Sequence, residues 1–286
     1  MAFAPGPAGP VHWAEAGSGP PVVLLHGLGG DIGFWAAERA DWQARFRLIL
    51  IDSRGHGATP ASPGGHSIAD LADDVAAVLD AAGIAAAHVL GFSMGGLVAQ
   101  SLAVRHPGRV DRLVLASTYA VMNPQARLFL DAVLDTYERS QDPAQMYRLI
   151  FPWLFSVAFL ADPAHDAWLP TDDVDLDDQS LADWRAAYLA QRRFDGRAQL
   201  GRIAAPTLVI GGGEDRLVDP AGTSALADGV PGAELTVLAG AGHLVNVEQP
   251  AAFRATVETF LGGPGALPGQ WLTPPASRAA SSSRAR

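Results

Sequence analysis

The sequence contains no cysteine, and all 20 of its basic residues are arginines because it contains no lysine. Without cysteine, the chain has no disulfide, no thiolate metal site and no cysteine nucleophile. Without lysine, it has no ammonium group for Schiff-base chemistry, a Ser–Lys dyad or a Walker-type phosphate loop. Several enzyme classes are therefore excluded before any motif is considered.

Basic residues are also fewer than acidic ones, 20 against 30, which gives a net charge of −10 at pH 7. An acidic surface repels phosphate backbones and anionic lipids, so we expect neither nucleic acid nor a membrane as a partner. The N-terminus has no basic segment followed by an apolar run, and the longest apolar stretch, residues 149–161, is too short to span a bilayer. We therefore expect a cytoplasmic protein.

Apolar runs typical of buried strands alternate with segments of helical periodicity, and the 286 residues suffice for one large core. Besides the run that leads into Gly91, the expected strands are residues 11–16, 22–25, 48–51, 110–116, 207–210 and 235–238. The expected helices are residues 34–45, 67–79 and 250–261, together with the segment after Ser93. This alternation predicts an α/β fold with a mostly parallel sheet flanked by helices, and sites at the carboxyl ends of its strands.

One segment, residues 119–200, breaks the alternation and shows only helical patterns rich in large apolar residues. We interpret it as a helical cap inserted between a first core part, residues 1–118, and a second, residues 201–262. Its large aromatic residues include Phe151, Trp153, Phe155, Phe159, Trp168 and Trp184. We expect most of them to pack the cap's own core and a few to line a pocket. The tail, residues 263–286, is rich in Gly, Pro, Ala, Ser and Arg and is predicted to be disordered.

Two groups of residues invite a metal-site interpretation that their spacing does not support. The acidic run at residues 171–178 lacks the glycine and the closing glutamate of a calcium loop, which favours a solvated acidic loop. His26, Asp52 and His56 have neither helical nor paired ligand spacing. We expect no metal and no cofactor.

A nucleophile is indicated by Gly91-Phe92-Ser93-Met94-Gly95, which lies where an apolar run meets a helical pattern. A serine at a sharp strand-to-helix turn is strained and exposes its hydroxyl. Gly91, Gly95 and Gly96 supply the room that such a turn needs. The turn also places Ser93 at a helix N-terminus, where unpaired N–H groups favour developing negative charge.

A serine nucleophile needs a base and an orienting acid, and the sequence offers both after later strands. Asp215 follows the apolar run 207–210, and His243 follows the run 235–238. Glu214 and Asp219 lie in the same loop as Asp215 and are alternatives for the acid, although Asp219-Pro220 fits the cap of the next helix better. The order Ser93, Asp215, His243 is that of one hydrolase architecture.

From about residue 11 to residue 261, the chain resembles the α/β-hydrolase fold superfamily. The resemblance rests on five motifs in order: His26-Gly27, the D-x-R-G-x-G turn at residues 52–57, the serine turn, the G-x-x-D loop and the G-x-G-H loop. It implies that Ser93 is the nucleophile, His243 the general base and acid, and Asp215 the orienting acid. It also implies an oxyanion hole made by the backbone N–H groups of Leu28 and Met94. His26 would shape the oxyanion loop, and Arg54 would bind loop carbonyls.

The resemblance further implies a serine hydrolase that works through an acyl-enzyme. The elbow is similar to those of enol-lactonases, small carboxylesterases and cofactor-free perhydrolases, and an aromatic cap suits a small to medium, largely apolar ester or lactone. Two alternatives remain: a C–C bond hydrolase of ring-cleavage products, and a ligand-binding, receptor-like protein on the same scaffold. Haloalkane dehalogenases and epoxide hydrolases of this fold need an aspartate where Ser93 stands.

Overall fold

A computed structural model describes residues 2–168 and 179–262. The acidic run at 171–178 and the tail at 263–286, for which we predicted a solvated loop and disorder, lie outside the described residues. Among the described residues, no helix is both long and apolar enough to cross a membrane.

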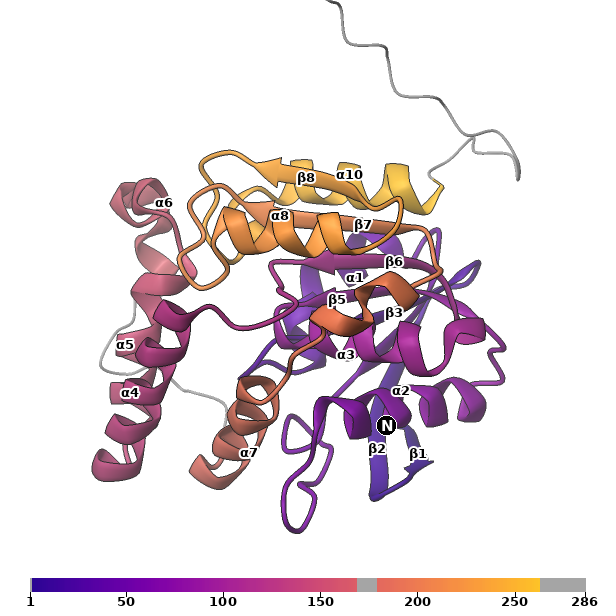
Figure 1. Cartoon of the computed structure of the whole chain (residues 1–286), viewed down its shortest axis with the longest axis horizontal. Coiled ribbons are helices and arrows are strands. Elements are labelled where there is room, and N and C mark those ends of the chain that lie inside the picture. The colour runs from indigo at the N-terminus through magenta and orange to yellow at the C-terminus, as the bar shows by residue number, and fades with distance from the viewer. Residues whose placement is uncertain (1, 169–178, 263–286) are drawn as a thin grey trace, which may run out of the picture.

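The centre of the molecule is a sheet whose described strands follow the order β1-β2-β4-β3-β5-β6-β7-β8 (Figure 1). The strands are β1 (Ala2–Gly6), β2 (Gly9–Ala16), β3 (Pro21–Leu25), β4 (Arg47–Ile51), β5 (Ala87–Phe92), β6 (Val110–Ala116), β7 (Thr207–Gly212) and β8 (Glu234–Leu238). From β4 to β8 all neighbours pair in parallel, whereas β1 and β2 are antiparallel to their neighbours. The predicted mostly parallel sheet is therefore confirmed.

Strand β1 was not predicted, because the first strand expected from the sequence begins at residue 11. The segment Ala2–Gly6 contains Pro5 and Gly6, which disfavour a strand when judged locally. It pairs only with β2, at the edge of the sheet, where a proline does not interrupt a ladder on its outer side. Hairpin pairing with β2 thus decides a conformation that the composition of residues 2–6 does not indicate.

Helices cover both faces of the sheet. They are α1 (Ala36–Trp42), α2 (Ile68–Ala81), α3 (Met94–Arg105), α8 (Pro220–Gly229), α9 (Val245–Glu248) and α10 (Pro250–Leu261). Side chains alternate along each strand: Val23 and Leu25 join the core beneath α2 and α3, whereas Val22 and Leu24 join the core beneath α1 and α10. Both faces of the central strands are therefore buried.

The start of α2 agrees with the prediction from the sequence, whereas the extent of α1 differs from it. Ser67 caps α2 through a capping box with Asp70, as the predicted start at residue 67 requires. The helix expected over residues 34–45 is instead a 3-10 turn, η1 (Ile32–Trp35), followed by α1, which ends at Trp42. After Trp42 the chain forms a turn in which the Arg45 and Phe46 N–H groups donate to the Trp42 carbonyl, and it then enters β4.

Between β6 and β7 the described chain is helical. It forms α4 (Pro124–Ser140), α5 (Pro143–Leu154), α6 (Val157–Ala161), η3 (Pro163–Trp168), α7 (Leu181–Arg192) and η4 (Arg197–Arg202). Figure 1 shows α4, α5 and α6 beyond the arrowheads of β6, β7 and β8, at the carboxyl edge of the sheet. An isolated β-bridge between Val121 and Asp195 joins the two ends of this helical segment. The helices therefore stand over the strand ends that carry the sequence motifs.

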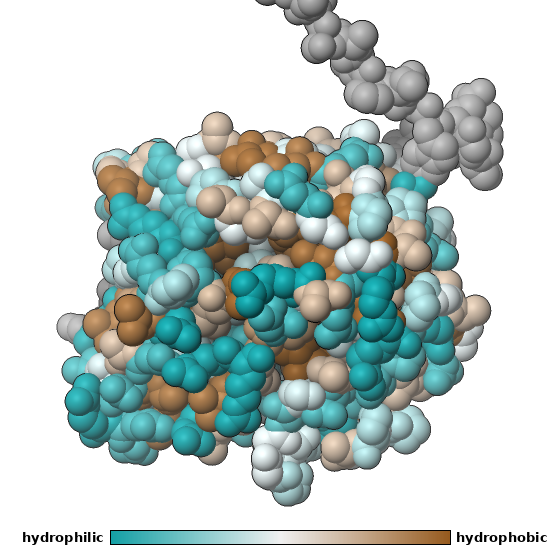
Figure 2. Space-filling view, viewed as in Figure 1, coloured by the Kyte–Doolittle hydropathy of each residue, from teal (hydrophilic) through white to brown (hydrophobic). Residues whose placement is uncertain are grey.

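The face of the molecule that is seen in Figure 1 is mainly hydrophilic. Figure 2 shows it as a mosaic in which apolar residues lie in scattered recesses rather than in one broad patch. Individual large apolar side chains are exposed on the helices after β6, among them Leu128 and Val157.

The partner of Arg54 differs from the one that we predicted. We predicted that its guanidinium binds loop carbonyls, but it forms an ion pair with Asp74 on α2, with 2.5 Å between Nη2 and Oδ1. Both side chains are almost fully buried. Sequence position alone placed Arg54 in a loop and did not show that α2 packs against that loop with Asp74 facing inward.

Asp74 and its neighbour Asp73 provide a matched test of this packing. We predict that Asp74→Asn lowers the free energy of unfolding by about 3–5 kcal/mol, because it leaves the buried Arg54 charge unpaired. Asp73 pairs with Arg105 and His106 at the surface, so Asp73→Asn is expected to cost no more than about 1 kcal/mol. Chemical denaturation of both variants measures the difference, and equal losses would contradict a buried, energetically coupled pair.

Candidate active site

Ser93 lies at the turn between β5 and α3 with a backbone φ of 51° and ψ of −115°. This left-handed region is unfavourable for a residue with a side chain. Two bonds hold it there: the Ser93 N–H donates to the Ala116 carbonyl (2.9 Å), and the Thr118 hydroxyl donates to the Ser93 carbonyl (2.8 Å). The strained turn is thus fixed from the neighbouring strand β6.

The glycines around Ser93 are required by close backbone approach. A Cβ on Gly91 would lie 2.3 Å from the Gly95 carbonyl oxygen, and one on Gly95 would lie 2.3 Å from the Leu25 carbonyl oxygen. Neither distance is possible for a real side chain. The prediction that these glycines make room for the turn is confirmed.

The structure brings the three predicted residues together from three different loops. The Ser93 Oγ lies 3.1 Å from His243 Nε2, and His243 Nδ1 lies 2.8 Å from Asp215 Oδ2. The other carboxylate oxygen of Asp215 accepts the backbone N–H groups of Leu217 and Val218, each at 2.9 Å. Asp215 and His243 are buried, so this carboxylate is held rigidly and orients the imidazole.

The two alternative acids occupy other positions. Asp219 caps α8, where its side chain accepts the Gly222 N–H at 2.7 Å. Glu214 is exposed and contributes its backbone N–H to the Ala241 carbonyl. Asp215 is the acid that contacts His243.

Met94 and Leu28 are the residues whose backbone N–H groups we predicted to form an oxyanion hole. Met94 is the first residue of α3, directly after Ser93, and Leu28 lies in the loop after β3. Within the described part of the chain, neither N–H donates to another protein atom. Unpaired N–H donors are what an oxyanion hole requires.

Two neutral histidines support the Leu28 loop. His26 is buried; its Nδ1 lies 2.7 Å from the Gly27 carbonyl oxygen, and its Nε2 accepts the Ser53 N–H at 3.0 Å. His56 accepts the Gly29 N–H through Nε2, and its Nδ1 lies 3.0 Å from the Arg54 carbonyl oxygen. Burial lowers the pKa of both imidazoles, to about 3 for His56, where the neighbouring His26 adds to the effect. Both imidazoles are therefore uncharged and hold the loop of Leu28 in place through hydrogen bonds.

A cavity of about 430 Å³ opens at Ser93 and His243, between the sheet edge and α4, α5 and α7. We call it the Ser93 cavity. Its apolar lining includes Phe34, Met122, Leu130, Met146, Ile150, Leu154 and Trp184. Among the described residues that line it, His243, Tyr119 and Tyr147 are the only ionisable ones, and none is an acid or an arginine.

Of the six large aromatic residues singled out in the sequence, Trp184 alone lines the Ser93 cavity. Phe151, Phe155 and Phe159 form a separate cluster, and Trp153 stacks on Phe129 with ring centres 4.0 Å apart. The expectation that most would pack the helical segment itself is therefore confirmed for these four. Trp168 stacks edge-on against Phe155 and is half-exposed.

The residues of α4 and α5 that line the Ser93 cavity were not predicted, although their spacing in the sequence is regular. Met146, Ile150 and Leu154 recur at every fourth position of α5, and Ala126 and Leu130 do so on α4. This spacing predicts one helix face. It does not distinguish a face that packs on a core from one that borders a cavity.

Within residues 2–168 and 179–262, no cluster of three or more histidine or acidic side chains is arranged to hold a metal ion. Asp52 instead accepts the N–H groups of Ile32 and Ala58 and pairs with His12 at 2.6 Å.

Comparisons of the sequence and of the structure with known proteins agree on one family. A family model described as alpha/beta hydrolase fold matches residues 20–250. A protein of Variovorax paradoxus, provisionally named carbamate hydrolase RutD, is 35% identical over 257 residues, which cover 88% of this chain and 96% of that protein. The 3-oxoadipate enol-lactonase 2 of Acinetobacter baylyi is 31% identical over 242 residues, 85% of this chain and 88% of its own. The crystal structure of the enol-lactonase from Burkholderia xenovorans LB400 has a TM-score of 0.81 at 30% identity and covers 91% of this chain and 99% of its own.

The chain belongs to the alpha/beta hydrolase fold family.

The predicted superfamily resemblance is thereby confirmed, and the protein is a hydrolase of the α/β fold. The names of its relatives include both carbamate and enol-lactone hydrolysis, so they do not select one substrate.

One residue of this family member went unrecognised in the sequence: Glu248, five positions after His243. Its carboxylate accepts the Gly242 N–H (3.0 Å), the Ser156 N–H (2.9 Å) and the Ser156 hydroxyl (2.6 Å). It therefore ties the loop of His243 to the start of α6. The signal was an acid shortly after a loop histidine, but its partner Ser156 is 92 residues away in the sequence.

The neutral state of His56 predicts a pH dependence of stability. Below about pH 6.5 the unfolded chain binds a proton that the folded state excludes down to about pH 3, so the unfolding free energy falls as pH is lowered through this window. We predict that His56→Gln, which keeps an acceptor for Gly29 but cannot be protonated, removes up to about 1.4 kcal/mol per pH unit of this dependence.

Chemical denaturation of wild type and variant between pH 6.5 and pH 4 measures this slope. His106→Gln, at a position where the imidazole is a third exposed and pairs with Asp73 at the surface, serves as the control for replacing a histidine outside the core. Parallel slopes for wild type and His56→Gln would contradict a buried neutral His56.

Proposed function

We propose that this protein is a serine hydrolase that cleaves an uncharged, largely apolar carboxylic ester or lactone through an acyl-enzyme. The observation that carries the proposal is the contact chain from Ser93 through His243 to Asp215 at the mouth of an apolar cavity. Nucleophile, base and orienting acid lie within hydrogen-bond distance of one another, as this chemistry needs.

In the first half-reaction the Ser93 Oγ attacks the substrate carbonyl carbon while its proton passes to His243 Nε2. The negative charge that forms on the carbonyl oxygen is stabilised by the N–H groups of Leu28 and Met94. The carbon–oxygen bond to the alcohol then breaks, and the alcohol oxygen takes the proton from His243.

In the second half-reaction His243 removes a proton from water, and the resulting oxygen nucleophile attacks the acyl carbon. The bond to Ser93 breaks, Ser93 regains its proton from His243, and the carboxylic acid is released. Asp215 keeps the imidazole in the tautomer that both halves require.

The lining of the Ser93 cavity supports an uncharged substrate. Burying a carboxylate there would leave it without a cationic partner among the described lining residues, which is costly. The pair formed by Tyr119 and Gln191, with 3.4 Å between the hydroxyl and Oε1, offers one polar contact for a hydroxyl or keto group.

The likeness to the protein named carbamate hydrolase RutD makes an uncharged carbamate ester a second candidate. Its carbonyl carbon is open to the same attack by Ser93. A free carbamate anion fits the cavity less well, for the same reason as a carboxylate does.

The substrate test uses two p-nitrophenyl esters of similar size, the neutral butyrate and the anionic hemisuccinate. We predict that kcat/KM favours the butyrate by at least about tenfold, because the hemisuccinate carboxylate must be desolvated without a partner. Ser93→Ala is expected to abolish both reactions while its thermal unfolding stays close to that of wild type.

A preference for the hemisuccinate would contradict the uncharged-substrate proposal, and an active Ser93→Ala enzyme would contradict the nucleophile. If the wild type binds the butyrate ester without turning it over, the receptor-like alternative is favoured. If the protein hydrolyses neither oxygen ester but cleaves a carbon–carbon bond in a ring-cleavage product, the C–C hydrolase alternative is favoured.

The assignment of the acid is tested by a matched pair of variants in one loop. Asp215→Asn should lower kcat by roughly 10³- to 10⁴-fold, because the amide disfavours the productive tautomer of His243. Asp219→Asn should change kcat by less than about threefold, since asparagine also caps a helix. Steady-state kinetics on one neutral ester measure both, and the reverse ranking would transfer the role to Asp219.

A further inference from the structure

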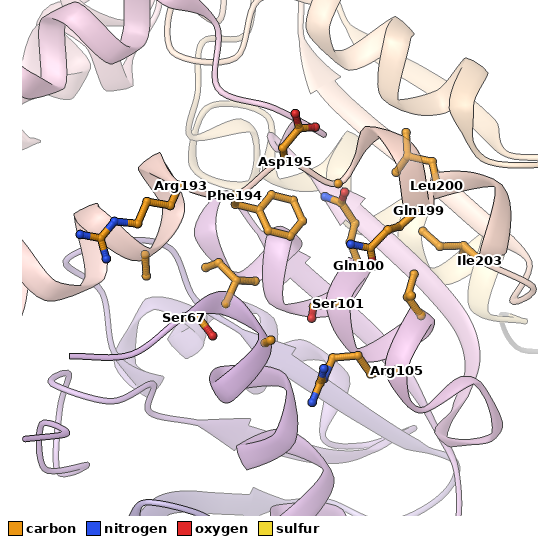
Figure 3. A pocket seen from close by; sticks show the side chains of 15 residues that line it. Ser67, Gln100, Ser101, Arg105, Arg193, Phe194, Asp195, Gln199, Leu200 and Ile203 are labelled. Carbon is orange, nitrogen blue, oxygen red and sulfur yellow. The ribbon is translucent and has the colours of Figure 1, made fainter. Parts of the chain in front are cut away.

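The two ends of the helical segment between β6 and β7 are attached to the core beside α3. The Gln100 amide donates to the Tyr119 carbonyl (3.0 Å), and the Gly196 N–H donates to the Ala120 carbonyl (2.8 Å). Figure 3 shows this region, where Gln100 of α3 lies beside Phe194. Neither bond reaches the nucleophile, the base or the acid. These bonds hold the ends of the segment, and other contacts hold its middle.

The middle of the segment is attached to the loop that carries His243. The attachment lies at residues 154–156, which join α5 to α6 and which we call the α5–α6 junction. Leu154 is the last residue of α5, so its carbonyl lacks a partner within the helix, and it accepts the Leu244 N–H at 3.0 Å. The peptide that follows His243 is therefore hydrogen-bonded to the junction.

The residue before His243 is bonded to the same junction through Glu248. The Glu248 carboxylate accepts the Gly242 N–H (3.0 Å), the Ser156 N–H (2.9 Å) and the Ser156 hydroxyl (2.6 Å). The two chain segments also approach each other closely, because a Cβ on Gly242 would lie 2.5 Å from the Ser156 nitrogen. His243 thus lies between two attachments to the α5–α6 junction.

The position of the imidazole depends on the backbone of His243 as well as on Asp215. Asp215 contacts Nδ1 and orients the ring, whereas the 3.1 Å between Nε2 and the Ser93 Oγ also requires the backbone to stay in place. Reacting groups must be held closely, since a displacement of about 1 Å can lower a rate roughly 100-fold. We therefore expect the attachments to the junction to affect catalysis and not stability alone.

The α5–α6 junction also borders the space where a substrate would lie. Leu154 lines the Ser93 cavity together with Ile150 on the preceding turn of α5, and Leu244 lines it beside His243. An acyl group that fills this part of the cavity packs against Leu154. It therefore restrains the junction, and with it the backbone of His243.

We propose that Glu248 is a positioning residue for the general base, because it makes the placement of His243 depend on the α5–α6 junction and thus on the acyl group that packs against it. The placement of His243 is a property of the structure, whereas its effect on turnover rests on the proposed function. Acyl groups long enough to reach the junction are then favoured in the catalytic step as well as in binding.

The positioning is tested by a pair of variants at one residue, with p-nitrophenyl butyrate as the substrate. Glu248→Ala should lower kcat about 10- to 100-fold with KM within about threefold of wild type, because the base is displaced while the cavity lining is kept. Glu248→Gln should restore kcat to within about threefold of wild type, since its amide oxygen can accept both backbone N–H groups and its nitrogen can donate to the Ser156 hydroxyl. An unchanged kcat in Glu248→Ala, or equal losses in both variants, would overturn the proposal.

Asp131→Ala is the matched control for a purely structural role. Asp131 on α4 accepts the Tyr188 hydroxyl and two N–H groups of Arg192, so it also takes part in three hydrogen bonds, all of them between α4 and α7. Thermal unfolding measures the loss of stability in both alanine variants, and kcat of Asp131→Ala should stay within about threefold of wild type. If Asp131→Ala lowers kcat as much as Glu248→Ala does, Glu248 acts only through stability and the proposal is overturned.

The dependence on the acyl group is tested with p-nitrophenyl acetate and p-nitrophenyl hexanoate, which share one leaving group. In wild type kcat should be at least about fivefold higher for the hexanoate, because contacts remote from the scissile bond are then expressed in the catalytic step. In Glu248→Ala the two values should lie within about twofold of each other, since the junction no longer holds the loop of His243. The same ratio in both proteins would overturn the coupling to the acyl group.

A structural measurement separates this proposal from the proposed function. If the wild type hydrolyses none of these esters, the proposed function fails, and crystal structures of the full chain still decide the positioning. The His243 Nε2 should lie beyond hydrogen-bond distance of the Ser93 Oγ in Glu248→Ala and within it in Glu248→Gln. An imidazole that keeps its place in Glu248→Ala would overturn the proposal.

Discussion

The backbone of Ser93 is the constraint on which the rest of the site depends. A serine held at a φ of 51° costs roughly 1–3 kcal/mol and persists only where its surroundings leave no alternative. Here β5 is buried between β3 and β6, α3 is buried along most of its length, and the glycines before and after Ser93 touch neighbouring backbone. The fold thus stabilises a conformation that the local sequence disfavours.

The other parts of the site are positioned relative to this turn by loops from neighbouring strands. Because the strands from β4 to β8 are parallel, the loops after β3, β7 and β8 reach the edge where Ser93 lies. Each loop has its own anchor: His26 and His56 for the loop of Leu28, two backbone N–H groups for Asp215, and Glu248 for the loop of His243. The last anchor also links the site to α6, so the helical segment and the His243 loop are connected by hydrogen bonds rather than by packing alone.

Sequence reasoning succeeded where a feature is local or follows from strand order. The strand ends, the elbow glycines and the meeting of Ser93, Asp215 and His243 all follow from a parallel sheet whose loops share one edge. It failed where the partner is distant in sequence and belongs to no motif. Arg54 needs Asp74 on a helix, and Glu248 needs Ser156, and neither pair can be read from one segment. Strand β1 was missed for a different reason: it forms a hairpin with the adjacent β2, but its Pro5 and Gly6 disfavour a strand. The lining of the Ser93 cavity could be predicted only in part. The helical spacing predicts which residues of α4 and α5 share one face, but not whether that face borders a cavity or a packed core.

The central claim is that Ser93 is a nucleophile activated by its surroundings, and covalent trapping tests it most directly. The full chain is treated with a fluorophosphonate, digested and analysed by mass spectrometry, beside an Asp215→Asn sample treated for the same time. We expect one adduct, on the peptide that contains Ser93, with labelling slowed strongly in Asp215→Asn. An unlabelled Ser93, or labelling spread over several serines at rates that Asp215→Asn does not change, would contradict the account.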